Sequence, residues 1–320
     1  MAPDWSRRAF LATTGASIVS SALIACGSST VESAITPSRF IAFGDGLSDL
    51  GNKGSRYTVN DGTVNVWVQQ LASSYGVAIS ASANGGSGFA VGNARVTGKP
   101  DASGNADTPT VTEQISNFLA TSAFGASDVA LVQGGISHVI YNHQRYTQGT
   151  INSSQFSAAL TQAGTELGAQ VRRLVTAGAK YVVVTGTYYL GSSPWASKLP
   201  NEASIITSAA AAFNTALLLA ISDLASNVLY VDSAYYFNLL INSPASYSLV
   251  DSTTVVCTST DVGDGLGIGS GQVNSALCTT STIASGLAYD SYLFADPVYF
   301  TPAANRLFGT YAYDRLKARF

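Results

Sequence analysis

The sequence FGDGLSDLGN, residues 43–52, begins where the short apolar run RFIAF (39–43) ends. An apolar run of this length that stops at a Gly-Asp-Gly sequence is typical of a buried strand followed by a tight loop. Three later runs have the same character: DVALVQ at 128–133, KYVVVTG at 180–186 and NVLYVD at 227–232. Strands that are covered on both faces have continuous apolar runs of this kind, so the sequence predicts a parallel sheet.

Helical patterns lie between these runs. One apolar face, with spacings of three and four residues, is formed by Phe156, Leu160, Ala163, Leu167, Val171 and Leu174. Residues 202–224 are apolar nearly all round, but Ser, Thr and Asn interrupt them, which favours a helix buried against the sheet over a membrane span. The alternation of strands and helices predicts one three-layer α/β domain with a central parallel sheet.

Composition excludes several classes of function. The chain has 320 residues, of which 46% are hydrophobic and 11% charged, enough for a sizeable core. Its formal net charge is −3, and no basic block extends beyond Arg7-Arg8, so no nucleic-acid partner is expected. The two histidines and three cysteines show no CxxC or HExxH spacing, so we expect neither a metal site nor a cofactor.

The N-terminal region has the features of a targeting sequence. SRRAFL, residues 6–11, has the paired arginines and the Phe-Leu of a twin-arginine export signal, and the apolar run up to Ala25 is too short to span a bilayer. LIAC, residues 23–26, resembles the lipobox of bacterial lipoproteins, in which the cysteine carries the lipid. An ordinary secretory signal that contains Cys26 is the alternative. The sequence predicts export to the bacterial cell envelope and a membrane attachment through lipidated Cys26.

These signals divide the chain into three parts. Residues 1–25 are expected to form the signal peptide, residues 26–37 the lipidated cysteine and a polar tether, and residues 38–320 the α/β domain. Gly27 follows the cysteine where an Asp would favour retention in the inner membrane, so the outer membrane is favoured.

Export also bears on the other two cysteines. Cys257 and Cys278 flank a Gly-rich segment that contains DVGDGLGIGSG, residues 261–271. In an oxidising compartment the two cysteines are expected to form a disulfide. A phosphate cradle or a calcium turn through Asp261 and Asp264 is the alternative role for the segment, but neither spacing matches, and a flexible loop is the prediction.

From about Phe40 to Phe320 the chain resembles the GDSL (SGNH) ester hydrolases. The resemblance rests on four blocks in order: FGDGLSDLGN, FAVGNARV (89–96), VQGGISHV (132–139) and LFADPVYFTPAANRL (293–307). It implies a flavodoxin-like three-layer fold in which the active-site residues lie in loops at the carboxyl ends of the strands.

The resemblance also implies which residues stand at the catalytic positions. In the family a serine attacks the ester carbonyl, a histidine accepts its proton, and an aspartate three residues before the histidine orients the ring. Here these positions hold Gly46, Tyr299 and Asp296. Glycine supplies no nucleophile, and a phenol, with a usual pKa of ~10, is protonated at neutral pH and cannot act as the base.

The oxyanion hole is altered as well. The family uses the backbone N–H of the nucleophile, the N–H of a glycine in the second block and an asparagine side chain. The corresponding residues are Gly46, Gly92 and Ser137. The two N–H groups are expected to remain as ligand donors, whereas the Ser137 hydroxyl is shorter than an asparagine amide, and loss of one such donor lowers the rate by a factor of ~10²–10³.

Neighbouring residues offer candidate replacements for the lost groups. Ser48 lies two residues past the nucleophile position, where the family uses the side chain to support the loop. His138, next to Ser137, is a candidate substitute base, the alternative being a loop histidine that is bonded to the backbone. His143, in YNHQRY, is expected at the surface.

Three functions follow from this pattern. The prediction is a lipid-anchored pseudoenzyme that binds an ester, acyl or carboxylate ligand in the former cleft. An ester hydrolase of altered mechanism, assisted by His138 or a bound water, is the alternative. The third is a structural envelope lipoprotein with a vestigial cleft.

Overall fold

Four parallel strands form the central sheet, in the order β1-β2-β3-β4, in a computed structural model that describes residues 34–320. The strands are β1 (Arg39–Phe43), β2 (Asp128–Gln133), β3 (Tyr181–Thr185) and β4 (Val228–Tyr230). Each coincides with one of the four predicted runs, and the parallel sheet is confirmed. The register pairs Ile41 with Ala130 and Ala130 with Val182, so the strands end at a common edge.

A short extended segment flanks β1 on the side away from β2. The Ala42 N–H donates to Ser87 O at 3.0 Å, and the Phe89 N–H donates to Ala42 O at 2.7 Å. β1 therefore has a neighbour on each side, this segment on one and β2 on the other. After β1 the chain first returns as this segment and only later as β2. In open α/β sheets, ligand crevices lie at such a switch point, outside the carboxyl ends of the strands.

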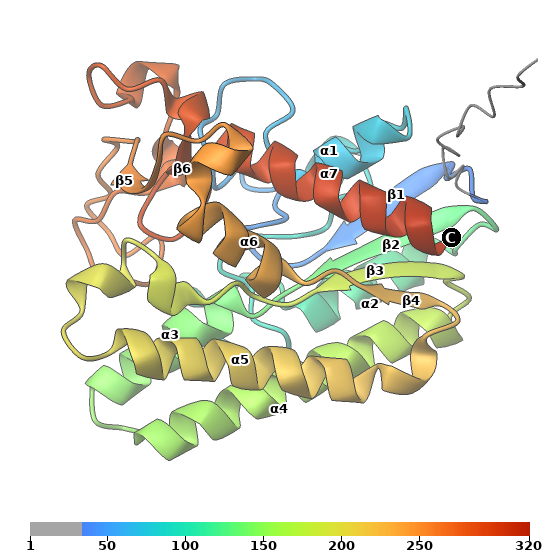
Figure 1. The fold of residues 1–320 in the computed structure, drawn as a ribbon. Coiled ribbons are helices and arrows are strands. Elements are labelled where there is room, and N and C mark those ends of the chain that lie inside the picture. Colours follow the sequence, from blue (N-terminus) through green and yellow to red (C-terminus); the bar gives the residue numbers. More distant parts are fainter. Residues whose placement is uncertain (1–33) are drawn as a thin grey trace, which may run out of the picture. The chain divides into compact units, whose positions relative to one another are not determined.

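Helices cover both faces of this sheet (Figure 1). The described residues form seven α-helices: α1 (Trp67–Ser74), α2 (Val111–Thr121), α3 (Ile136–Thr147), α4 (Ser153–Thr176), α5 (Ala203–Ala220), α6 (Ser233–Asn242) and α7 (Pro302–Arg319). They also form short 3-10 helices: Ser82–Asn84, Leu190–Ser192, Ala196–Lys198, Ser222–Leu224, Pro244–Tyr247, Ser275–Leu277, Thr280–Thr282 and Tyr289–Ser291. Helices α1, α6 and α7 lie on one face and α2 to α5 on the other, which confirms the three-layer α/β prediction.

Helix α4 shows how the sequence pattern produces the packing. The helix begins at a capping box in which Asn152 accepts from the Gln155 N–H and the Gln155 side chain accepts from the Asn152 N–H. All six positions of the predicted apolar face are buried. Burial of this face against the sheet, rather than intrinsic helix propensity, supplies most of the stability of such a helix.

Helix α5 lies within the predicted range 202–224 but is buried on one side only. Gly164 of α4 allows close packing here, because a Cβ on that glycine would stand 2.2 Å from Phe213 O of α5. On the outer side of α5, the side chains of Leu218 and Leu219 are 42% and 72% exposed. By length and composition alone α5 could cross a membrane, but in the structure it packs against α4 as part of the domain.

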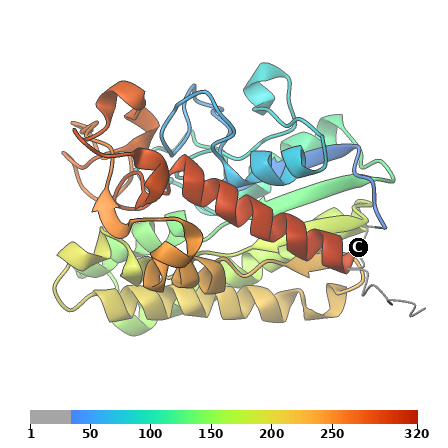
Figure 2. The ribbon, with the colours of Figure 1, turned by 45° about the horizontal axis from the view of Figure 1, so that its top comes forward.

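The C-terminal part of the chain adds a second, two-stranded parallel sheet, β5 (Asp251–Val255) with β6 (Tyr292–Phe294). Between these strands lies the segment that contains both cysteines, coloured orange in Figure 2 and gathered at the end of the domain opposite the C-terminus. At the other end of the chain, Ile35 is only 8% exposed and belongs to the hydrophobic core. Packed residues therefore begin within the stretch expected to form the tether.

Candidate active site

Three loops and the first turn of α3 meet at the carboxyl end of β1 and bring the residues expected at the site together. Gly46 follows β1, Gly92 follows the segment that flanks it, Ser137 stands in the first turn of α3, and Tyr299 lies between β6 and α7. Gly46, Gly92, Ser137, Asp296 and Tyr299 are all buried. The positions implied by the family resemblance thus converge, but on a packed interior.

Gly46 and Tyr299 fit against each other. A Cβ placed on Gly46 would stand 2.6 Å from the Tyr299 hydroxyl oxygen and 2.7 Å from its Cζ, closer than real side chains approach. The Tyr299 side chain is fully buried, and its hydroxyl has no hydrogen-bond partner among residues 34–320. The phenol therefore fills the space that a serine side chain at position 46 would enter, so the two departures from the family pattern depend on one another.

A second tyrosine covers Gly92. A Cβ on Gly92 would stand 2.0 Å from Tyr57 Cε2, and the rings of Tyr57 and Tyr299 lie 5.0 Å apart, centroid to centroid. We refer to Tyr57 and Tyr299 as the tyrosine pair. Burial raises the pKa of both phenols, and the nearby carboxylates, Asp49 for Tyr57 and Asp45 for Tyr299, raise it further. Both rings therefore stay neutral at physiological pH, and Tyr299 is no base.

The expectation that the Gly92 N–H is free for a ligand is wrong. This N–H donates to Asp49 Oδ2 at 2.8 Å, while Asp49 Oδ1 accepts from the N–H groups of Gly51 and Asn52. The carboxylate of Asp49 thus binds the second loop to the first. Of the two predicted backbone donors, Gly46 N–H is the one that remains for an oxyanion.

Asp45, which the sequence did not single out, lies at the centre of this buried region. Its Oδ1 accepts from the Leu47 N–H at 3.2 Å and its Oδ2 from the Ser137 N–H at 3.4 Å. Gln133 accepts from the Asp45 N–H at 3.2 Å. Burial raises the pKa of Asp45 from 3.8 to about 6, although the hydrogen bonds from Leu47 and Ser137 act to lower it.

Asp296 holds the backbone of its own loop. Its Oδ1 accepts from the Val298 and Tyr299 N–H groups, both at 2.7 Å, and its Oδ2 accepts from the Ser275 N–H at 2.9 Å. Burial raises its pKa, and hydrogen bonds from Ser275, Tyr299 and Val298 oppose that rise. The carboxylate that orients a catalytic ring in the family contacts the main chain of residue 299 here.

His138 has no nucleophile to activate. It lies in the first turn of α3, and its Nδ1 accepts from the Val96 N–H at 3.4 Å. Within the described part of the chain, no Ser, Thr or Cys side chain is hydrogen-bonded to its ring. Burial, with Arg95 nearby, lowers its pKa to about 3, so the ring is a weak proton acceptor. This geometry corresponds to the alternative weighed from the sequence, a histidine bonded to backbone.

The expectation that His143 lies at the surface is wrong. Its side chain is buried, its Nε2 pairs with Glu202 Oε2, and its ring meets the Trp195 ring edge-on at 4.8 Å. The loop around Trp195 folds over α3, which a local sequence pattern does not reveal. His143, Trp195 and the Gly-rich segment near Asp264 line a pocket of about 450 Å³.

The predicted disulfide is confirmed. Cys257 and Cys278 are bonded, with 5.9 Å between their Cα atoms. Cys278 O accepts from the Asn60 N–H at 2.9 Å, so the bridge also fixes the loop that carries Tyr57. Asp261 and Asp264 accept from the N–H groups of Gly263 and Gly269 within their own segment. In the part of the chain described, no group of three or more His, Cys, Asp or Glu side chains is placed to hold a metal ion.

Comparisons with known proteins find a likeness in structure rather than in sequence. No family model matches the chain, and no curated protein is significantly similar in sequence. Among solved structures, the chain is similar to a member of the lipolytic protein G-D-S-L family from Veillonella parvula DSM 2008, with 15% identity and a TM-score of 0.43. The match covers 86% of this chain and 96% of that one.

Proposed function

We propose that this protein is a lipid-anchored envelope protein of GDSL/SGNH hydrolase type that does not hydrolyse esters, because packed side chains fill the place of the hydrolytic centre. The observation that carries the proposal is the 2.6 Å between the Tyr299 hydroxyl oxygen and the Cβ that a residue at position 46 would have. Nucleophile, base and substrate space are lost together, because the residue at the base position occupies the place of the nucleophile.

The active-hydrolase alternative lacks its chemical groups. His138 is bonded to the Val96 N–H and has a pKa lowered to about 3 by burial, and Tyr299 is a neutral phenol. Ser48 donates to Gln133 Oε1 at 3.5 Å and accepts from the Trp67 Nε1–H at 2.9 Å, so it supports the loop. A general base must reach the proton that it accepts, and within residues 34–320 neither His138 nor Tyr299 is placed to do so.

Ligand binding in the former cleft requires the tyrosine pair to move. An ester, acyl or carboxylate group that reached the Gly46 N–H would have to displace the Tyr299 ring, which is fully buried. The geometry therefore favours the third function, an envelope lipoprotein with a closed vestigial cleft, over a pseudoenzyme that binds such a ligand at this place.

The test combines turnover with ligand binding. Wild-type protein should hydrolyse p-nitrophenyl butyrate no faster than buffer, and butyrate or hexanoate should leave its Tm unchanged. Tyr299→Ala should gain a butyrate-dependent rise in Tm because it opens a cavity beside the Gly46 N–H, whereas Phe300→Ala, at the neighbouring buried ring, should not. Turnover by the wild type that is lost in His138→Ala would overturn the proposal.

A ligand-dependent rise in the Tm of the wild type has a different meaning. It would support the ligand-binding pseudoenzyme instead of the closed vestigial cleft, and would show that the tyrosine pair opens in solution. Export and anchoring through Arg7-Arg8 and Cys26 lie outside the described residues and form part of the proposal on sequence grounds alone.

A further inference from the structure

The end of the domain at which the strands begin differs in charge from the rest of the described molecule. β1 starts there at Arg39, β3 follows Lys180, and α4 and α7 finish there (Figure 1). Contacts join these parts: the Asn227 side chain donates to Lys180 O at 3.1 Å, and Arg319 donates to Ala225 O at 2.6 Å. We call this end the amino-end surface.

The amino-end surface is basic although the chain as a whole has a net charge of −3. Its cations are Arg39, Arg172, Arg173, Lys180, Arg315, Lys317 and Arg319, and its carboxylates are Asp128, Asp223 and Asp314. The rest of the described chain carries seven cations, at 53, 56, 95, 99, 145, 198 and 306, against twice as many Asp and Glu side chains. The charge of the domain is therefore polarised along the strand direction.

Most of this positive charge is available to a partner. Arg39 pairs with Asp128 and Arg172 with Asp223. Lys180, Arg315 and Lys317 have no carboxylate of the described chain within ion-pair distance.

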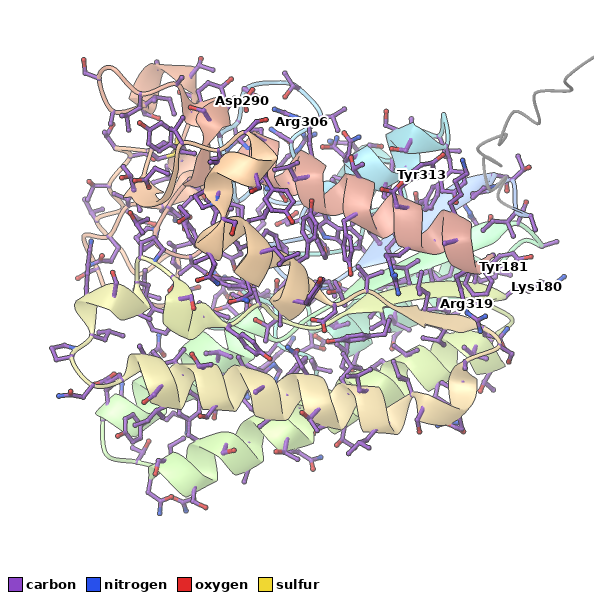
Figure 3. The ribbon with its side chains drawn as sticks, in the orientation of Figure 1. Lys180, Tyr181, Asp290, Arg306, Tyr313 and Arg319 are labelled. Carbon is purple, nitrogen blue, oxygen red and sulfur yellow. A yellow bond between two sulfur atoms is a disulfide. The ribbon has the colours of Figure 1, made fainter. Side chains whose placement is uncertain are left out.

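Aromatic and apolar side chains lie among these cations. Tyr181 and Phe320 meet edge to face at 5.2 Å, and Tyr75 and Tyr313 do so at 4.9 Å. Figure 3 shows Lys180, Tyr181, Tyr313 and Arg319 at this end of the molecule. The side chain of Leu219, at the end of α5, is 72% exposed nearby. Tyrosine with Lys or Arg is the combination that membrane proteins place at the lipid headgroups.

The described chain also starts at this surface. The Ser38 N–H, just before β1, donates to Ser127 O at 3.2 Å, just before β2. Ala34, the first described residue, is eight positions after Cys26. Eight residues span at most roughly 28 Å even when fully extended. A lipid on Cys26 would therefore hold this end, rather than the former active site, close to the bilayer.

We propose that the amino-end surface lies flat against an anionic lipid bilayer. The proposal rests on the lipid anchor of the proposed function and adds an orientation to it: Lys180, Lys317 and Arg319 face lipid phosphates, Leu219 dips into the headgroup layer, and the former cleft faces away. Each cation near an anionic bilayer strengthens its binding roughly fivefold at moderate salt.

The test measures lysine accessibility on vesicles. The lipoprotein, purified from membranes, is placed on phosphatidylcholine vesicles or on vesicles that contain phosphatidylglycerol, treated with an acylating reagent and analysed by mass spectrometry. On the anionic vesicles, labelling of Lys180 and Lys317 should fall several-fold and recover in high salt. Lys198, an exposed lysine outside this surface, is the internal control and should be labelled equally on both.

Two variants identify the surface that binds. Lys180→Glu should abolish the protection of Lys317 on anionic vesicles, and Lys198→Glu should leave it unchanged. Equal labelling of Lys180 on both kinds of vesicle would overturn the orientation.

Flotation tests the anchor separately. A lipid anchor makes the protein float with neutral vesicles too. If the protein floats with both kinds of vesicle and Lys180 is labelled equally on both, the orientation is rejected and the anchor is kept. Flotation on anionic vesicles alone, with Lys180 protected, would keep the surface and reject the anchor, whereas no flotation on either would reject both.

Discussion

At the scale of single residues, Gly46 and Tyr299 depend on each other. A glycine at position 46 leaves room for the Tyr299 ring, and the ring fills the space that the glycine leaves. Reversal of either change alone meets an obstacle: serine collides with the phenol, and histidine at 299 finds no nucleophile. Packing therefore keeps this interior closed, because overpacking a well-filled interior is unfavourable.

This dependence predicts a stability coupling. Gly46→Ser should lower the free energy of unfolding by about 1–3 kcal/mol, because its Cβ would collide with Tyr299. Tyr299→His, added to it, should recover part of this loss because the imidazole ring is smaller. Gly263→Ser, where a Cβ meets only an ordinary contact at 3.4 Å, is the control and should change stability little. Urea unfolding of the wild type, of Gly46→Ser and Tyr299→His singly, and of the double variant gives the coupling, and additive effects would contradict the reciprocal fit.

The same pair predicts how hydrolysis could be introduced, if positions 46 and 299 correspond to the nucleophile and the base as proposed. Gly46→Ser alone should stay inactive on p-nitrophenyl butyrate, because a serine without its base is a weak nucleophile. Gly46→Ser with Tyr299→His should show a non-additive rise, and Ser137→Asn should raise it further through the oxyanion hole. A folded double variant with no more turnover than either single one would argue against the assignment of positions 46 and 299.

Asp45 predicts a pH dependence of stability. Its pKa rises from 3.8 to about 6 on burial, so between these pH values the folded protein holds a proton that the unfolded chain has released. This contribution to stability is complete below about pH 4 and is lost as the pH rises through about 6. Asp45→Asn should therefore raise the free energy of unfolding at pH 7 by about 1–3 kcal/mol, with little effect at pH 4.

Asp128 provides the control of opposite sign. Against the raising effect of its burial, the hydrogen bond from Arg39 lowers its pKa, so its contribution is present at neutral pH and declines in acid. Asp128→Asn should destabilise the protein at pH 7. If Asp45→Asn also destabilised it at pH 7, the hydrogen bonds from Leu47 and Ser137 would outweigh the burial of the charge.

The sequence predicted which segments converge but not which side chains fill the space between them. The blocks around Gly46, Gly92, Ser137 and Tyr299 converge as the family resemblance implies. Tyr57 belongs to no block and comes from a loop whose path depends on the bond between the Asn60 N–H and Cys278 O. A contact between residues more than two hundred positions apart leaves no local pattern. The pairing of the Gly92 N–H with Asp49, which is 43 positions away, also depends on how two separate loops pack and leaves no local pattern.

At the scale of elements, the strands were predictable and the burial of α5 was not. A strand covered on both faces must be apolar along its whole length, so its limits are visible in the sequence. The apolar residues of α5 fill its outer face as well as its inner one, and nothing local distinguishes the two. Gly164 and Gly168 of α4 mark the inner face only once the two helices are seen together.

The disulfide-closed segment gives an element-scale prediction. Its cysteines are 21 positions apart, and in the chain-entropy model a loop of this size contributes about 3 kcal/mol. Cys257→Ala with Cys278→Ala should lower the free energy of unfolding by about that amount. Hydrogen exchange should increase most in residues 258–277 and around Asn60, with the central sheet little changed. Thiol labelling of the unfolded wild type that found two free cysteines would contradict the bond.

At the scale of the whole molecule, the charge distribution and the predicted anchor agree. The basic end of the domain is the end at which the described chain starts, so an anchor on Cys26 and the unpaired cations would act on the same surface. An anchor alone would set the distance of the domain from the bilayer but not its orientation, and a few cations alone bind weakly and are sensitive to salt. Together they would bind the domain in one orientation.

The final prediction separates export from anchoring. If Arg7-Arg8 and Cys26 act as their motifs indicate, wild-type protein should sediment with membranes and carry a lipid on Cys26 that mass spectrometry detects. Arg7→Lys with Arg8→Lys should leave the protein in the cytoplasm, where Cys257 and Cys278 stay reduced, so thiol labelling reports export independently of fractionation. Cys26→Ala removes the site of lipidation and should abolish the lipid-bearing peptide, while oxidation of the other two cysteines shows whether export continues. Lys180→Glu should leave lipidation unchanged, because it acts only on the orientation of the domain. Wild-type protein that was oxidised, unlipidated and recovered from the soluble fraction would show an ordinary secretory signal and refute the anchor. This result would not affect the fit of Gly46 and Tyr299, which the stability and turnover variants test separately.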